Sequence, residues 1–366
     1  MTRRIVVLTS FTAGGGAQQA AQRVADGLRE RGHDVELWFL YRRGPAPEAR
    51  VRSRFIVDGP LSGLGYLTLA PRLFAALRRH RPDAVLSFLP LAHVVGQSVA
   101  ALLGIERRVV SHRSVCNTYH PLLRIADRLL GSIGVYSKVI AVSGAVAASV
   151  ARYPADYVRR VSVVHNGVDW RASALSRSQA RAAFGLPAGA PLLLAVGRLA
   201  AQKNYPLLVE AAAGVPDLVL VIAGSGHQAP ALAEQARGLG MDGRLLLLGH
   251  LPPERLPDLY RACDVFALAS LYEGQSNALL EAMAEGMLIL ASDIPEQRET
   301  LIDEAGCMAG VLLPLNDPAA WREAIRQALA SGGERDRLGQ LARERAGAFT
   351  MARMIGGFEE AVCGDS

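Results

Sequence analysis

The sequence lacks any long uninterrupted hydrophobic run. Its longest apolar stretch, Val85 to Ile105, is broken by proline, histidine, glycine and glutamine, whereas a membrane-spanning helix needs about twenty apolar residues in succession. The basic start, Arg3-Arg4 before Ile5 to Leu8, resembles a signal peptide, but its apolar core is too short and leads into Gly14-Gly15-Gly16 rather than a cleavage site. We therefore expect no membrane span and no leader, and a buried first strand instead.

Cysteines are few and widely separated. Cys116, Cys263, Cys307 and Cys363 form no Cys-x-x-Cys pair and have no neighbouring histidine ligands, although disulfide frameworks and zinc sites both depend on closely spaced ligands. The pattern predicts reduced thiols in a cytoplasmic protein, with no bound metal and no cofactor.

Length and charge indicate two different domains. A chain of 366 residues exceeds the size that one hydrophobic core usually serves. Met1 to His165 holds 23 Lys and Arg against 10 Asp and Glu, a net charge of +13, whereas the remainder holds 17 against 24, a net charge of −7. This asymmetry favours an anionic surface or substrate for the first domain. An arginine-rich, high-GC proteome that replaces lysine on solvated faces explains it equally well.

Short β-branched runs alternate with amphipathic stretches along the whole chain. The predicted strands are Arg4–Thr9, Asp34–Phe39, Ala84–Phe88, Arg107–Ser111, Val139–Val142, Ser162–Val164, Leu192–Val196, Leu218–Ala223, Arg244–Leu248, Val265–Leu268 and Met287–Ala291. The predicted helices include Ala17–Arg31, Leu207–Ala213, Gln228–Leu239, Glu254–Arg261, Ala278–Glu285, Ala319–Ala330, Glu334–Ala346 and Met351–Val362.

This alternation predicts the α/β class, since near-continuous apolar strands separated by helices form parallel sheets covered on both faces. Two Rossmann-like doubly wound domains are expected, residues 1–165 and 166–350, with a ligand cleft at their carboxyl-terminal strand ends. No internal repeat or low-complexity segment interrupts the pattern.

The most informative segment runs from Ser270 to Ala284. It leaves a predicted strand, crosses a polar loop and enters a helix that Ser276 or Asn277 can cap. The unpaired N–H groups and positive dipole of such a helix start suit a diphosphate. Glu281, in the second turn, is placed to accept hydrogen bonds from a ribose, and Glu273 to address a sugar. Taken alone, two glutamates eight residues apart are more often solvated surface charge.

A second loop follows the strand Leu192–Val196 and contains Gly197, Arg198 and Lys203. Two cations on such a loop can hold both phosphates of a departing nucleotide diphosphate, where they stabilise the transition state more than the ground state. An exposed basic turn is the alternative. Further strand ends carry Gly224 and the pair Gly249-His250, where backbone groups are placed to contact a nucleotide base. A plain strand-to-helix connection at Gly224 is equally consistent.

The sequence has no Asp-x-Asp, the spacing by which many sugar transferases hold a divalent ion against the diphosphate. Arg198, Lys203 and the helix start would have to supply the positive charge instead. This pattern predicts a metal-independent reaction.

Together these segments resemble glycosyltransferase family 4, whose members are retaining GT-B enzymes that act on nucleotide sugars. The resemblance is strong over Val163 to Glu299. It includes Val164-His165-Asn166-Gly167-Val168-Asp169, the loop Gly197 to Asn204, Ala223-Gly224-Ser225-Gly226, Tyr260 to Asp264, and the two glutamates 273 and 281 with seven residues between them.

The resemblance implies a role for each matching residue. Arg198 and Lys203 would contact the diphosphate, Glu281 the ribose, and Glu273 the transferred sugar. Gly15 and Gly16 look like the family's N-terminal loop at the diphosphate, and the helix 351–366 is expected to join the first domain. The expected donor-binding set is Gly15, Gly16, Gly197, Gly224, Gly249, His250, Gly274, Gln275, Ser276, Asn277, Ala278, Leu279 and Glu281.

Three departures from the family pattern affect the sugar pocket. Gln275-Ser276 replaces a common aromatic-proline pair, Met287-Leu288-Ile289 replaces a proline-containing strand, and Ser292 to Glu296 lacks a glycine pair. The identity of the sugar is therefore left open.

The N-terminal half matches only loosely, as expected if it recognises the variable acceptor. His112 resembles a histidine that many members carry near the reacting sugar and is the fourth expected catalytic residue, beside Arg198, Lys203 and Glu273. Arg113 is placed to hold an anionic acceptor group. A lone histidine at a strand end is just as often a structural hydrogen-bonder.

The resemblance implies transfer of a hexose from a UDP- or GDP-sugar, with retention, to a saccharide or lipid-linked acceptor in cell-envelope assembly. Two alternatives are a GT-B nucleotide-sugar epimerase and a catalytically silent sugar-nucleotide-binding subunit. No nucleic-acid partner is expected for this protein. The segment Leu61 to Arg81 combines apolar residues with arginines, which predicts a peripheral contact with the inner face of an anionic membrane. Packing of its leucines on the sheet is the competing expectation.

Overall fold

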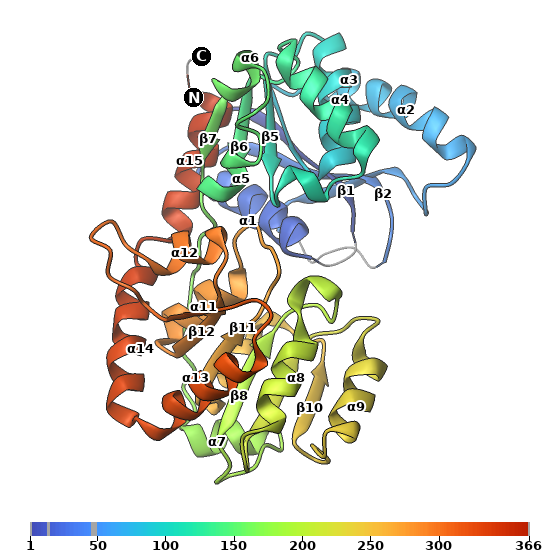
Figure 1. Ribbon diagram of the computed structural model, residues 1–366. Helices are drawn as coiled ribbons and strands as arrows, with labels where there is room; N and C mark the ends of the chain where they lie inside the picture. Colours follow the sequence, from blue (N-terminus) through green and yellow to red (C-terminus); the bar gives the residue numbers. More distant parts are fainter. Residues whose placement is uncertain (1, 13–14, 45–49, 365–366) are drawn as a thin grey trace. The chain divides into compact units, whose positions relative to one another are not determined.

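The computed structural model describes residues 2–12, 15–44 and 50–364. Its contacts divide the chain into two compact units, and each is described by itself (Figure 1). Unit 1 comprises Met1–Gly167 with Met351–Ser366, and unit 2 comprises Val168–Thr350.

Unit 1 is built on a seven-stranded parallel sheet in the order β3-β2-β1-β4-β5-β6-β7. The strands are β1 Arg4–Phe11, β2 Asp34–Tyr41, β3 Arg52–Val57, β4 Ala84–Phe88, β5 Arg107–His112, β6 Lys138–Ala141 and β7 Val161–Val163. The helices are α1 Gly16–Glu30, α2 Leu64–His80, α3 Gln97–Leu102, α4 Pro121–Ser132, α5 Gly144–Ala148, α6 Ala155–Val158 and α15 Met351–Cys363, with short turns at Ala92–Gly96 and Cys116–Thr118.

Both faces of this sheet are buried, because alternate side chains of β1 enter different cores. Ile5 and Val7 pack against α1 and α15, whereas Val6 and Leu8 pack against α2 and α3. The C-terminal helix α15 therefore completes one face of unit 1, far in sequence from the strands that it covers.

Unit 2 repeats the pattern with six parallel strands in the order β10-β9-β8-β11-β12-β13. The strands are β8 Leu192–Val196, β9 Val219–Ala223, β10 Leu245–Gly249, β11 Val265–Leu268, β12 Leu288–Ser292 and β13 Val311–Leu313. The helices are α7 Arg177–Ala183, α8 Tyr205–Ala213, α9 Ala229–Gly238, α10 Leu256–Ala262, α11 Asn277–Glu285, α12 Pro295–Leu301, α13 Pro318–Ala330 and α14 Gly332–Ala346. Alternate residues of β8 again face two cores.

The predicted fold class is confirmed, since both units are doubly wound parallel sheets. Two strands were not predicted, β3 and β13. The first carries exposed Arg52 and Arg54 and lies at a sheet edge, where burial imposes no apolar run. The second is only three residues long.

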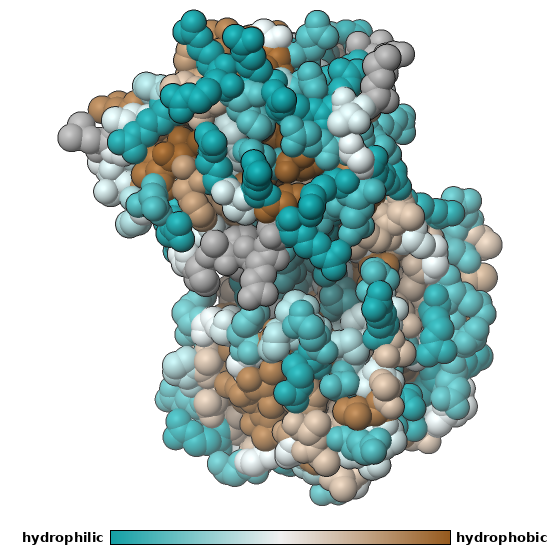
Figure 2. Space-filling model, turned by 180° about the vertical axis from the view of Figure 1, so that it is seen from behind, coloured by the Kyte–Doolittle hydropathy of each residue, from teal (hydrophilic) through white to brown (hydrophobic). Residues whose placement is uncertain are grey.

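The exposure of side chains along α2 tests the prediction that the segment Leu61 to Arg81 contacts a membrane. Leu69, Leu73 and Leu77 of α2 are buried in the core of unit 1, so they are not available as membrane anchors. Tyr66 and Leu67 are exposed by 56% and 72%. Figure 2 shows brown hydrophobic areas among mostly hydrophilic atoms. Among the described residues, no helix is long and apolar enough to cross a membrane.

Candidate active site

The order of strands in unit 2 brings two predicted loops together. The parallel strands β8 and β11 are neighbours. From β8 the chain adds strands toward one edge of the sheet, and from β11 it adds them toward the other edge. Ligands of doubly wound folds bind at such a switch point, outside the carboxyl ends of the strands. The loop with Arg198 and Lys203 leaves β8, and the loop with Glu273 leaves β11.

Lys203 and Glu273 form an ion pair between these loops. The Lys203 Nζ donates to Glu273 Oε1 at 2.6 Å, and the Ser270 hydroxyl donates to the same oxygen at 2.7 Å. Backbone bonding supports the contact, because the Leu271 N–H donates to the Gln202 carbonyl at 2.8 Å. Lys203 and Glu273 are 70 positions apart in sequence, and their ion pair holds both side chains in place.

Glycines allow the turns after β8 and β9 to approach closely. Gly197 and Gly224 have φ values of +152° and +150°, which favour glycine. A Cβ added at Gly224 would lie 1.9 Å from the Gly197 carbonyl oxygen. The Gly224 N–H donates to the Gly249 carbonyl at 2.7 Å. The three predicted glycines therefore lie together at one sheet edge, and a side chain at Gly224 would separate the turns.

The start of α11 has the capping geometry that its sequence predicts. Ser276 is the N-cap, and its hydroxyl accepts a hydrogen bond from the Leu279 N–H at 3.4 Å. Gly274, Gln275 and Ser276 are buried directly before the helix, as are Ala278 and Leu279 within it. Among the described residues, the Asn277 Oδ1 is buried with no hydrogen-bond partner. The helix start is thus enclosed by protein on several sides.

Glu281 lies one turn further along α11 and accepts a hydrogen bond from the Tyr260 hydroxyl at 3.0 Å. The same hydroxyl lies 3.1 Å from the Ala278 carbonyl. Burial, and then the Glu281 carboxylate, raise the pKa of Tyr260 well above its usual range. Tyr260 therefore stays a neutral donor that orients Glu281.

Arg198 and His250 are exposed, unlike the other residues of the predicted set in unit 2. Arg198 lies in the same loop as Lys203 and, within the described chain, neither hydrogen-bonds nor pairs with an acidic side chain through its guanidinium. It is therefore a cation available to an anionic ligand.

Sequence reasoning assigned no role to Ser270 or Glu296. Glu296 is the second residue of α12, which follows the neighbouring strand β12, and it is 5% exposed. Burial, and to a lesser degree the nearby Glu273 carboxylate, raise the pKa of Glu296 above its usual value. Its position after a strand adjacent to β11 was the available signal, because carboxyl ends of parallel strands meet at one edge.

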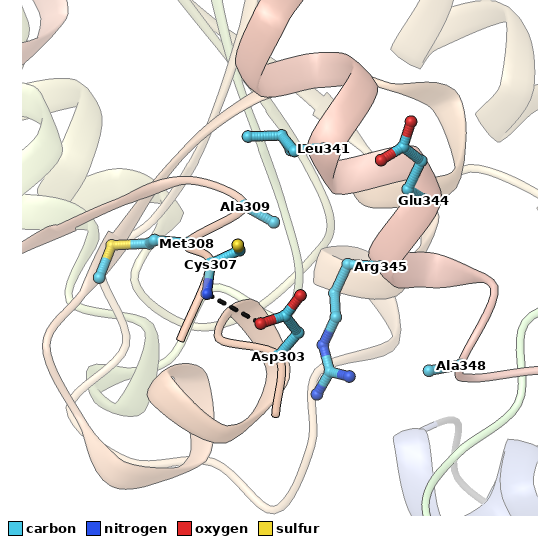
Figure 3. Close-up of a pocket in the computed structure, with 8 residues that line it drawn as sticks. All are labelled: Asp303, Cys307, Met308, Ala309, Leu341, Glu344, Arg345 and Ala348. Carbon is cyan, nitrogen blue, oxygen red and sulfur yellow. Dashed lines mark hydrogen bonds between the residues drawn. The ribbon is translucent and has the colours of Figure 1, made fainter. Parts of the chain in front are cut away.

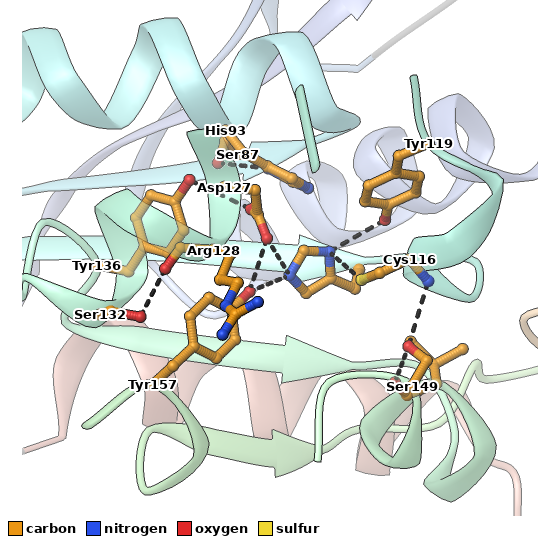
Figure 4. A network of polar contacts seen from close by, with 12 residues as sticks. Ser87, His93, Cys116, Tyr119, Asp127, Arg128, Ser132, Tyr136, Ser149 and Tyr157 are labelled. Atoms are coloured by element: carbon orange, nitrogen blue, oxygen red, sulfur yellow. Dashed lines mark hydrogen bonds and ion pairs between the residues drawn. The ribbon is translucent and has the colours of Figure 1, made fainter. Parts of the chain in front are cut away.

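In unit 1, His112 lies inside the protein rather than on its surface. Its neighbours Tyr119, Asp127 and Tyr157 are labelled in Figure 4. Its side chain is 1% exposed, and that of Asp127 is fully buried. The ring Nε2 lies 2.7 Å from the Tyr157 hydroxyl, which donates to Asp127 Oδ2 at 2.9 Å. The ring Nδ1 lies 3.0 Å from the Tyr119 hydroxyl. Both ring nitrogens thus lie within hydrogen-bond distance of a tyrosine hydroxyl. The structure therefore does not show the expected arrangement, in which His112 faces a ligand.

The His112 ring is held in its charged form. Burial alone would lower its pKa, but Cys116 and Asp127 more than offset this and raise the pKa to about 9. A charged ring donates from both nitrogens, which matches two tyrosine oxygens as acceptors. His112 and Asp127 thus form a buried charge pair, 3.7 Å apart and bridged by the Tyr157 hydroxyl, that links β5 to α4.

Two family models match the chain, "Glycosyltransferase Family 4" over residues 14–171 and "Glycosyl transferases group 1" over residues 176–345. A D-inositol 3-phosphate glycosyltransferase of Nocardia farcinica is 30% identical, over 98% of this chain and 88% of that protein. The chain belongs to glycosyltransferase family 4.

Other similar proteins include a more distant relative and solved structures with the same fold. The lipopolysaccharide core biosynthesis glycosyltransferase LpsE of Rhizobium meliloti is 24% identical, over 91% of both chains. Among solved structures, Anabaena HepE in complex with UDP and glucose has a TM-score of 0.84 at 19% identity, covering 98% of this chain and 99% of that one. WaaG, a glycosyltransferase involved in lipopolysaccharide biosynthesis, has a TM-score of 0.78 at 18% identity, covering 99% and 100%.

The remaining predicted residues of this family 4 chain lie in unit 1. Arg113 donates to Asn166 Oδ1 and lies 5.9 Å from the Phe88 ring centroid, and burial lowers its pKa to about 10. Gly15 is the N-cap of α1 and Gly16 its first residue. The neighbouring residues 13 and 14 of the predicted glycine loop lie outside the described residues.

A small cavity of about 220 Å³ in unit 2 lies apart from the predicted residues (Figure 3). It is lined by Asp303, Cys307 and Arg345 among others, and Asp303 accepts a hydrogen bond from the Cys307 N–H at 2.8 Å. Arg345 donates to the carbonyls of Glu299 and Thr300. Glu344, also in the lining, accepts a hydrogen bond from the Gln340 side chain. Because Asp303, Glu344 and Arg345 are bonded within the protein, we assign the cavity no function.

Proposed function

We propose that this protein transfers a hexose from a nucleotide diphosphate sugar, bound by unit 2, to an acceptor bound by unit 1. The observation that carries the proposal is the Lys203–Glu273 pair at the β8/β11 switch point, next to exposed Arg198. As the bond to the sugar breaks, negative charge accumulates on the diphosphate. Fixed cations at that position stabilise the charge without reorganising.

The substrates follow from the same residues and from the relatives. Glu281, oriented by Tyr260, suits a ribose diol, and the α11 start suits a phosphate. HepE binds UDP and glucose, which supports a UDP-hexose as donor. Relatives named for inositol phosphate and for lipopolysaccharide core support an acceptor that is phosphorylated or lipid-linked. The basic unit 1 matches either kind.

We propose transfer with retention and without a metal ion, with the departing phosphate accepting the proton of the acceptor hydroxyl. No separate carboxylate base is then required. Glu273 orients Lys203 and the sugar. His112 acts by positioning β5 and α4, since both of its ring nitrogens are already bonded.

A donor panel tests this function. Purified protein is incubated with UDP- and GDP-hexoses, with and without inositol phosphate or lipid-linked saccharide, and free nucleotide diphosphate and the anomeric configuration of the product are measured. Acceptor-dependent release with retention supports the proposal. Acceptor-independent release with a changed sugar would favour an epimerase, and binding without release would favour a silent subunit.

We also propose that unit 1 contacts an anionic membrane, through α4 rather than through α2. Leu122, Ile125 and Leu129 of this helix are exposed by 71%, 63% and 59%, and Ile133, directly after its end, is exposed by 67%. The one acidic residue of α4, Asp127, is buried, and Arg128 is exposed. Apolar anchors with basic neighbours suit an anionic interface.

Vesicle co-sedimentation tests the contact, with Leu129→Gln compared with Leu239→Gln, an exposed leucine of unit 2. Binding that rises with anionic lipid, weakens with salt and falls only in Leu129→Gln supports α4. Equal, negligible binding to neutral and anionic vesicles would leave a soluble acceptor as the better interpretation.

A further inference from the structure

A cavity of about 550 Å³ opens in unit 1 at the sheet edge opposite to the carboxyl ends. Its lining comes from the C-terminal ends of α2 and α3 and from residues that precede or begin β1, β4 and β5. Ligands of doubly wound sheets bind at the carboxyl ends. This cavity is therefore separate from the residues proposed to bind donor and acceptor.

The charged lining is dominated by arginine. Arg3, Arg78, Arg81 and Arg107 contribute four positive charges, against Asp83 and Glu106. One Asp83 oxygen already accepts the Arg4 backbone N–H at 2.7 Å. Within the residues that the structure describes, none of these four guanidinium groups donates a hydrogen bond or forms an ion pair. We call this cavity the arginine pocket.

Helix ends explain only part of this arrangement. Cations are favoured near the carbonyls of a helix C-terminus, which accounts for Arg78 in the last turn of α2. Arg3 and Arg107 come from strand starts, where no such carbonyls lie in their own element. Their convergence with Arg78 needs another reason.

Arg81 adds a conformational observation. It ends α2 with φ +50° and ψ +59°, in the left-handed region. Glycine is the usual residue there, and other residues cost about 1 kcal/mol or more. Arg81 therefore occupies a backbone conformation that disfavours it, and it lines the pocket.

We infer that the arginine pocket binds a phosphate anion of at least two negative charges. Guanidinium forks bind phosphate oxygens in pairs, and four forks exceed what a single carboxylate satisfies. The volume lies within the range of small-ligand sites, and Leu77 and Ile105 belong to the lining. The same chemistry is found in soluble diphosphates and in the phosphate headgroup of a lipid.

The test compares two double variants of the full chain that remove the same charge from the same segment. Arg78→Gln with Arg81→Gln alters the arginine pocket. Arg72→Gln with Arg79→Gln removes two exposed arginines that do not line it. All four side chains are exposed, so folding is expected to be unaffected. The probes are inorganic pyrophosphate, measured by calorimetry, and vesicles of phosphatidylcholine with phosphatidic acid.

We expect saturable binding of at least one probe that weakens tenfold or more in the pocket variant and less than twofold in the control. Binding of pyrophosphate identifies a soluble ligand, and binding of vesicles alone identifies a lipid headgroup. Equal loss in both double variants, or no saturable binding to the wild type, would overturn the inference. So would pyrophosphate binding that Arg198→Gln abolishes and the pocket variant retains, because the anion would then occupy the proposed donor site.

Discussion

The two units use buried charge for different purposes. In unit 2, Lys203 and Glu273 belong to loops, and exposed Arg198 stands in the same loop as Lys203. In unit 1, His112 and Asp127 lie on β5 and α4 and are sealed from solvent. A pair on loops at a switch point is available to a ligand, whereas a pair between core elements holds those elements together. Removing a charge from the pair is therefore expected to reduce activity in unit 2 and stability in unit 1.

The largest expected effect is on turnover. Lys203→Ala or Arg198→Ala should each lower kcat by about a thousandfold with the fold intact, because under the proposed function each removes a cation at the departing diphosphate. Nucleotide release by the purified variants measures this, with Arg237→Ala, an exposed arginine of α9, as the control. Turnover close to wild type in both variants would show that the site is wrong.

The loops of unit 2 could be predicted because their chemistry is local in sequence. Glycines, a capping serine and two cations follow strands that are themselves obvious, and the strand order then decides that the β8 and β11 loops meet. Predicting the Lys203–Glu273 contact requires that strand order, which the spacing of residues in the sequence does not give.

The network of His112 could not be predicted in the same way. Its partners come from α4 and from the segments around Tyr119 and Tyr157, and nothing in the local pattern of Asp127 distinguishes it from the surface carboxylate of an amphipathic helix. Its burial follows from how α4 packs, with its apolar stripe turned outward. The sequence pattern places leucines inside and charges outside, and α4 reverses this.

A substitution in that network is expected to affect stability before activity. Asp127→Asn keeps the shape but removes the charge opposite His112 and should cost about 4 kcal/mol, since breaking a buried pair leaves an uncompensated charge. Hydrogen–deuterium exchange is the suitable measurement, because it reports each unit separately. Faster exchange is expected in β5 and α4, with unit 2 unchanged.

The matched control is Asp156→Asn, whose carboxylate forms an exposed pair with Arg159 in the same unit. Exposed pairs contribute less than about 1 kcal/mol. Equal protection in the two variants would show that burial of Asp127 has no energetic consequence, and the contrast between the units would fail.

Alkaline pH should weaken unit 1 more than unit 2. The pKa of His112 is about 9 in the folded chain against the ordinary histidine value of 6.5, so folding favours the protonated ring. The associated stability is complete below pH 6.5 and is lost as pH rises through 9, by about 3 kcal/mol. Exchange of β5 peptides across this range measures the loss, and His112→Gln should remove it. A wild-type profile as flat as that of the variant would contradict the charged form.

The smallest expected effect is that of a chelator. Activity should survive excess EDTA, because the chain contains no Asp-x-Asp and Arg198, Lys203 and the α11 start supply the positive charge from unit 2 itself. The measurement is nucleotide release before and after EDTA, in wild type and in Lys203→Ala. If unit 2 holds all the positive charge that the leaving group needs, added magnesium should not raise nucleotide release by either protein. Complete loss in EDTA that magnesium or manganese restores would mean that a metal ion shares this task, and the loop cations would then be secondary.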